Sequence, residues 1–159
     1  MRIETRAEIE VAKPREEVFD FAVACETFPR VLLALGPLPG VAQARMRDGA
    51  DPKPGALREI GLTDGSAIDE ELLALDRPAR HRYRWANRPE PPLGWLVRAG
   101  EGDWVFSSSG SDTRIRWTYR FELSHVIALP LALPIVGLFR IWMARGLARI
   151  RDALEARSL

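Results

Sequence analysis

The sequence predicts an α+β fold in which antiparallel strands precede one long C-terminal helix. Two stretches, residues 2–11 and 113–123, alternate charged or polar residues with apolar ones, which is typical of strands with one buried face. Near the C-terminus, one side of a helical wheel holds Phe139, Met143, Leu147, Ile150 and Leu154. The length of 159 residues suits one domain, which we assign to residues 1–159.

Two short helices are expected after the first strand. Lys13-Pro14 ends that strand, and Pro14 suits the first turn of a helix over residues 15–28. Pro29 is expected to break this helix, and a second short helix is expected at residues 31–35.

The middle of the chain reads as strands separated by turn residues. Asp64-Gly65 predicts a tight hairpin, and Gly100 and Gly102 are expected to be β-bulges in one long or paired strand. The strands are expected at residues 41–47, 56–63, 67–75, 80–86, 93–107 and 113–123. Together with the first strand this makes an antiparallel sheet of six to seven strands.

The C-terminal helix is expected at about residues 131–157 and has two parts. From Phe139 onward it carries one apolar stripe opposite a charged face. Residues 126–138 are apolar all round and are expected to be interrupted by Pro130 and Pro134. Their 14-residue uncharged run, which continues to Phe139, is shorter than the roughly 20 residues of a membrane span. We therefore expect residues 126–138 to be a gate, a dimer contact or a membrane-touching edge. The wider segment 126–142 is expected to dock a partner, a second copy of the chain or a membrane.

Three segments carry a resemblance to a known family. They are IEVAKPREEVFDFAVACETFPRV, GALREIGLTDGSAIDEELLALDRPARHRYRW and SDTRIRWTYRFEL, and they cover nearly the whole chain in the family's order. The chain resembles the START-like, or SRPBCC, superfamily, in particular its branch of polyketide cyclases/dehydrases and lipid-transport proteins. The resemblance implies a helix-grip fold, a curved antiparallel sheet wrapped around the C-terminal helix with an apolar cavity between them. It also implies a hydrophobic ligand such as a lipid, polyketide or isoprenoid, with catalysis in a minority of members.

Large aromatic residues are expected to wall this cavity. On the predicted strand parities and helix face, most of them point into one enclosed space. The proposed ligand-binding residues are Tyr83, Trp85, Trp104, Trp117, Tyr119, Phe139 and Met143.

Two polar residues are candidates for acid–base chemistry. His81 shares strand parity with Tyr83 and Trp85, so it is either a general acid/base or a histidine held by a nearby carboxylate or carbonyl group. Glu71 lies inside the cavity if its parity follows Leu73, where burial would raise its pKa, and in water if Leu72 points inward.

Other classes of function have little support. The net charge is +1, from 23 basic and 22 acidic residues, which argues against a nucleic-acid partner. Two histidines and Cys25 form no metal-ligand spacing, and no cofactor-binding motif occurs, so neither metal nor cofactor is expected. The start of the chain lacks the apolar core of a signal peptide, so a cytoplasmic protein, or one peripheral to a membrane, is expected.

The sequence supports three hypotheses about the function of the protein. The first is binding or transport of a hydrophobic small molecule in the internal cavity. The second is a cyclase or dehydratase that uses His81 or Glu71 as its acid or base. The third is a membrane- or partner-docking protein that acts through residues 126–142.

Overall fold

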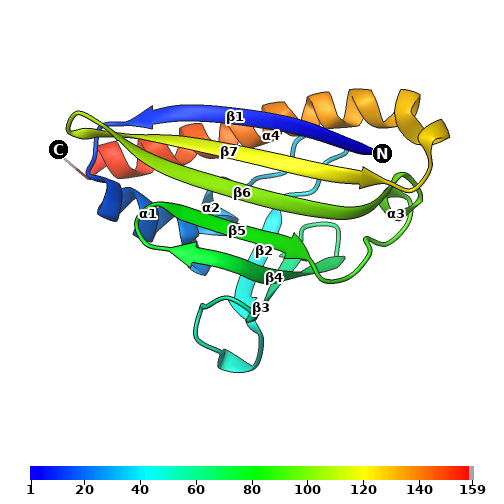
Figure 1. Ribbon diagram of the computed structural model, residues 1–159, viewed down its shortest axis with the longest axis horizontal. Helices are drawn as coiled ribbons and strands as arrows, with labels where there is room; N and C mark the ends of the chain where they lie inside the picture. The colour runs from blue at the N-terminus through cyan, green and yellow to red at the C-terminus, as the bar shows by residue number, and fades with distance from the viewer. Residues whose placement is uncertain (158–159) are drawn as a thin grey trace.

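One antiparallel sheet of seven strands forms the frame of the protein in the computed structural model, which describes residues 1–157. The strand order across the sheet is β1-β7-β6-β5-β4-β3-β2, so the first and last strands of the chain are neighbours (Figure 1). The strands are β1 Arg2–Val11, β2 Val41–Met46, β3 Leu57–Leu62, β4 Ala67–Asp76, β5 Arg80–Trp85, β6 Val97–Ser109 and β7 Asp112–Leu123. The predicted sheet of six to seven strands is confirmed.

The long helix α4, Leu129–Ala156, runs along the sheet and confirms the helix-grip fold (Figure 1). Its residues Met143, Leu147, Ile150 and Leu154 have no exposed surface, as the apolar stripe predicted. The other helices are α1 Arg15–Val23, α2 Phe28–Val31 and α3 Leu93–Leu96, with 3₁₀ turns η1 Cys25–Thr27, η2 Arg47–Gly49 and η3 Val126–Ala128.

The expected interruption of the C-terminal helix by prolines is wrong. The helix is continuous from Leu129, with Pro130 in the first turn and Pro134 inside it. A proline in the first turn forfeits no helical hydrogen bond, because the N–H groups there have no partner within the helix. Pro134, one turn later, removes a single bond at an exposed position.

The second short helix lies earlier than predicted. It spans Phe28–Val31 rather than residues 31–35, and Pro29 occupies its first turn instead of ending a helix. The error has the same cause as the one in α4, since a proline can start a helix as readily as it stops one.

Ion pairs connect the outer faces of β1 and β7. Arg114 donates to Glu10, Arg116 to Glu8 and Arg120 to Glu4, each at 3.0 Å. These pairs follow directly from the antiparallel register, which places the two members of each pair opposite each other. The arginine row of β7 is therefore neutralised by the glutamates of β1.

Candidate functional site

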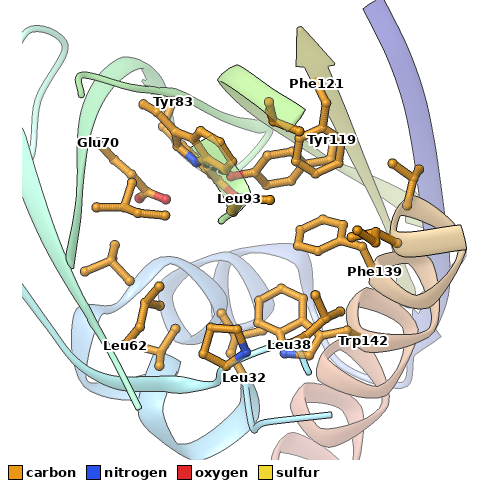
Figure 2. A pocket seen from close by; sticks show the side chains of 18 of the residues that line it. Leu32, Leu38, Leu62, Glu70, Tyr83, Leu93, Tyr119, Phe121, Phe139 and Trp142 are labelled. Atoms are coloured by element: carbon orange, nitrogen blue, oxygen red, sulfur yellow. Dashed lines mark hydrogen bonds between the residues drawn. The ribbon is translucent and has the colours of Figure 1, made fainter. Parts of the chain in front are cut away.

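An internal cavity of about 130 Å³ lies between the concave face of the sheet and the helices. Strands β2 to β7 supply one side, and α2, α3, the loop before β2 and the first half of α4 supply the other (Figure 2). Nearly all of the side chains around it are apolar, and Glu70 is the only residue of the lining that can carry a charge near neutral pH. The arrangement favours an apolar guest over a charged one.

Most of the predicted aromatic residues line this cavity. The structure brings together Tyr83, Trp85, Trp104, Trp117, Tyr119 and Phe139. Their rings form a continuous cluster, in which the Trp104 and Trp117 centroids are 4.3 Å apart and the Tyr119 and Phe139 centroids 5.0 Å apart. Met143, the seventh proposed residue, is fully buried and lies outside the cavity lining.

The wall also contains Trp142, which is not part of the predicted apolar stripe and belongs to the segment 126–142 that was expected to make an external contact. Its ring lies 5.1 Å from that of Phe139 and 5.9 Å from that of Trp117, and the residue is 9% exposed. Two faces of α4 are buried at this level, because the loop before β2 covers the side that the sheet leaves open.

Two glycines of β6 make room for the aromatic wall. A Cβ atom at Gly100 would lie 2.7 Å from Cε2 of Trp85, and one at Gly102 would clash with the Tyr83 ring. The prediction that these glycines are β-bulges is wrong, because both pair in regular register with β7 and the irregularity of β6 lies earlier, between Val97 and Ala99. Gly102 also pairs regularly with Tyr83 of β5. They are glycines because the rings of β5 lie directly over the backbone of β6.

The phenol groups of the wall are hydrogen-bonded to its indoles. Trp85 Nε1 donates to Tyr119 Oη at 2.7 Å, and Trp104 Nε1 donates to Tyr83 Oη at 3.4 Å. Burial raises the pKa of both tyrosines well above the ordinary value, so both hydroxyls are neutral at physiological pH. These bonds fix the ring orientations while leaving the interior of the cavity uncharged.

A buried ion pair forms the polar edge of the cavity. Arg58 on β3 is 2% exposed and donates from Nε (2.9 Å) and Nη2 (2.6 Å) to Oε2 of Glu70 on β4. Its guanidinium also lies between the rings of Phe28 and Tyr83, at 4.8 and 5.1 Å from their centroids. Burial raises the pKa of the Glu70 carboxyl above its ordinary range, and the Arg58 guanidinium opposes this rise.

His81 is held on the far side of Arg58 and does not line the cavity. Arg58 Nη1 lies 3.1 Å from His81 Nε2, and His81 Nδ1 lies 3.2 Å from the Ala74 carbonyl oxygen. Arginine can only donate, so Nε2 accepts and Nδ1 carries the proton. Burial and the neighbouring Arg58 charge lower the pKa of His81 to about 3. Of the two interpretations of His81, this geometry favours the histidine held by a carbonyl group, and a general acid at neutral pH has no support.

Glu71 points to the outside of the sheet. Its carboxylate accepts from Arg84 on the neighbouring strand at 2.8 Å, whereas Leu72 is 1% exposed and faces the core. Of the two parities considered for this strand, the one with Leu72 inside is therefore the observed one. An irregularity in the β4–β5 pairing between Leu72 and Ala74 then shifts the parity, so that Leu75 is opposite the buried His81.

The sequence analysis missed Arg58 and Glu70, although a signal for them existed. The hairpin around Asp64-Gly65 pairs Arg58 directly with Glu70, two residues from the pairing of Ile60 with Ile68. Both charged residues thus share the parity of the apolar residues that face the core. Two opposite charges at facing inward positions of one hairpin predict a buried ion pair.

No metal cluster accompanies this site. Within residues 1–157, no group of three or more His, Cys, Asp or Glu side chains could hold a metal ion.

Comparison with known proteins identifies the family. The family described as polyketide cyclase / dehydrase and lipid transport matches residues 2–157. The chain belongs to this family. The resemblance to the START-like, or SRPBCC, superfamily is thereby confirmed. No curated protein sequence matches the chain.

Solved structures share the fold at low sequence identity. The protein TTHA0849 from Thermus thermophilus is 23% identical with a TM-score of 0.71, and the match covers 99% of this chain and 100% of that one. Ginseng major latex-like protein 151 from Panax ginseng is 12% identical with a TM-score of 0.67, covering 96% and 97%. The di-domain ARO/CYC BexL from the BE-7585A biosynthetic pathway is 16% identical with a TM-score of 0.66, covering 95% of this chain and 49% of that one.

Proposed function

We propose that the protein binds a hydrophobic small molecule, such as a lipid, polyketide or isoprenoid, between its sheet and α4. The observation that carries this proposal is the cavity itself, which is walled by aromatic rings and closed by the long helix. Ligand pockets typically combine such apolar walls with a few polar groups that orient the guest. Here the Arg58–Glu70 pair and the two tyrosine hydroxyls supply those groups.

The volume of the cavity limits what binds without rearrangement. Its 130 Å³ is close to the roughly 150 Å³ of an engineered cavity that holds benzene, and smaller than the roughly 300 Å³ at which drug-sized pockets begin. A single ring or a short chain therefore fits the cavity as it stands. A longer ligand has to displace side chains at the end of the cavity that is lined by α3 and the start of α4. Burial of each ligand methylene group contributes about 0.8 kcal/mol of binding free energy, which offsets the cost of moving these side chains.

A cavity-filling variant tests the proposal. Ala132 lines the cavity from α4, so Ala132→Phe is expected to weaken binding of the single-ring probe toluene, followed through the fluorescence of the tryptophans in the wall, by about tenfold or more. Ala144→Phe adds the same ring at an exposed position of the same helix and serves as the matched control. Fluorescence titration gives both affinities. Equal binding by the two variants would contradict a ligand in this cavity.

A second candidate function is a cyclase or dehydratase reaction in the same cavity. It is favoured by one observation, the carboxylate of Glu70 at the edge of an apolar space, where burial raises its pKa and with it its strength as a general base. Glu70 takes the role for which the sequence analysis considered His81 and Glu71. Glu70→Gln is expected to abolish turnover of a cyclisable substrate while leaving probe affinity within about twofold, and unchanged turnover would remove Glu70 from the mechanism.

The proposal includes an external contact through residues 126–142. Five large apolar side chains of this segment are exposed, which supports a partner outside the chain. They are Val126, Ile127, Leu131, Leu133 and Ile141.

A further inference from the structure

Exposed apolar side chains gather at one end of the molecule. Their exposed fractions range from 53% for Leu133 to 87% for Ile127, far above those of core residues. This apolar tip consists of Met1, Trp95, Val126, Ile127, Leu131 and Leu133. A contiguous apolar surface of this kind marks a site of interaction.

Backbone hydrogen bonds hold the three segments of the tip together. The Ser124 N–H donates to the Leu96 carbonyl at 2.9 Å, and the Ser124 hydroxyl lies 3.3 Å from the Gly94 carbonyl, so Trp95 on α3 lies beside the start of η3. The Leu123 N–H donates to the Met1 carbonyl at 2.9 Å, which brings the N-terminus to the same place. Figure 1 shows the first turns of α4 projecting past the end of the sheet there. The tip is thus a protruding end and not a flat face.

The tip is apolar enough to enter a lipid bilayer, but its charge-free stretch is too short to cross one. The stretch Val126–Ala156 meets the length and composition of a membrane span, yet only 17% of its most apolar 18-residue window is buried, unlike a core helix. From Leu129 to Phe139, where its charge-free part ends, the helix is about 17 Å long, against roughly 30 Å of hydrocarbon. Beyond that point α4 is packed on the sheet. Insertion into one bilayer interface suits these dimensions, as does the exposed Trp95.

Two positive charges border the tip. The first is that of Arg140, which is exposed just after the apolar stretch, whereas Arg145, Arg149 and Arg151 lie further along α4. The amino group of Met1 adds a further positive charge at the tip. Glu122, the acidic residue next to this segment, is neutralised by Arg98. Anionic lipid headgroups complement such a border.

We propose that the apolar tip docks onto the surface of a bilayer that contains anionic lipids. The charges favour this partner over a second copy of the chain. A symmetric dimer would bring two copies of the Arg140 and Met1 charges together, and Glu90, exposed in the loop before α3, is the acidic residue that could offset part of this repulsion. A bilayer instead offers hydrocarbon to the protruding side chains and anions to Arg140 and the N-terminus.

Docking in this way connects the bilayer with the cavity. Ile135, Val136 and Phe139 line the cavity from the turns of α4 that follow the tip, and Leu93 and Leu96 line it from the two ends of α3. A hydrophobic molecule leaving the bilayer beside the tip would thus reach the end of the cavity lined by α3 and α4 without crossing water. This route rests on the proposed ligand-binding function, whereas the docking itself does not.

Co-sedimentation of the full chain with vesicles tests the docking. Binding to phosphatidylcholine vesicles containing phosphatidylglycerol is expected, with weaker binding to phosphatidylcholine alone and at high salt. Ile127→Glu removes an inserted side chain and adds a negative charge, so it is expected to weaken vesicle binding by about tenfold or more. Ala144→Glu adds the same charge at an exposed position of α4 about 25 Å from Ile127, and it is expected to weaken vesicle binding by no more than about fivefold.

Two results would overturn the inference. One is vesicle binding that is absent from the wild-type protein or unaltered in Ile127→Glu. The other is a dimer in sedimentation velocity that Ile127→Glu converts to a monomer, which would assign the tip to a second copy of the chain. Ala132→Phe separates this inference from the proposed function, because filling the cavity is expected to weaken probe binding by about tenfold or more and to leave vesicle binding unchanged.

Discussion

Acid should destabilise this protein through His81, because the folded protein holds this imidazole in its neutral form. Arg58 donates to Nε2 and Nδ1 is bonded to the Ala74 carbonyl, so protonation would set a second donor against the guanidinium. The pKa of His81 falls from an ordinary 6.5 to about 3. The unfolded chain therefore binds the proton more tightly, and the stabilisation is complete above about pH 6.5 and is lost as the pH falls toward 3.

The size of the effect follows from the two pKa values. At about pH 5 the linkage relation gives a loss of about 2 kcal/mol of unfolding free energy relative to about pH 7.5. This value is insensitive to the folded pKa as long as that pKa lies below about 4, because the folded protein then binds almost no proton at pH 5.

Urea denaturation followed by tryptophan fluorescence measures the loss. His81→Gln is the matched control, since its side-chain oxygen can still accept from Arg58 but does not titrate. Glu70 has a raised pKa and changes stability in the opposite direction, but it is present in both proteins and its effect cancels in the comparison. We expect the wild-type protein to lose about 2 kcal/mol more than His81→Gln between about pH 7.5 and pH 5. Parallel pH profiles for the two proteins would refute a neutral His81 bonded to Arg58.

Two further predictions concern the ion pair and the glycines. Arg58→Met should lower the unfolding free energy by about 3–5 kcal/mol, because it leaves the Glu70 carboxylate buried without a partner. Adding Glu70→Leu to the same protein should restore most of this loss in urea titrations. A double variant as unstable as Arg58→Met alone would be inconsistent with this account. Gly102→Ala should lower the unfolding free energy by about 1–3 kcal/mol, because the added methyl group overpacks against Tyr83. The control Gly137→Ala, at an exposed helical site with open space around it, should raise the unfolding free energy by about 0.5–1 kcal/mol. Equal shifts in the melting temperatures of the two variants would contradict the packing of β5 on β6.

The sequence predicted the parts of the fold that depend on periodicity. The alternation in β1 and β7 and the apolar stripe of α4 reflect burial of one face, and the structure buries those faces. The same strand parities predicted that most of the aromatic residues of the cavity wall lie together, because side chains of one strand parity must share one side of the sheet.

The errors arise where one residue type has two structural uses. Proline either starts or interrupts a helix, and the choice for Pro29 and Pro134 depends on packing far away in the sequence. Glycine in a strand marks either a bulge or the close approach of another group, and at Gly102 only the position of the Tyr83 ring on β5 decides.

The polar edge of the cavity was missed for a related reason. The irregular pairing after Leu72 reverses the parity within β4, so no single alternation describes the whole strand. An analysis of the hairpin as a pair of strands, rather than of each strand alone, would have placed Arg58 opposite Glu70.

The central claim is that the cavity holds a hydrophobic molecule, and native mass spectrometry of protein purified from its source tests it most directly. The account predicts an added mass that an organic solvent extracts, present in the wild-type protein and in Ala144→Phe but absent from Ala132→Phe. A wild-type spectrum that shows the bare polypeptide alone, together with no uptake of toluene, would contradict it.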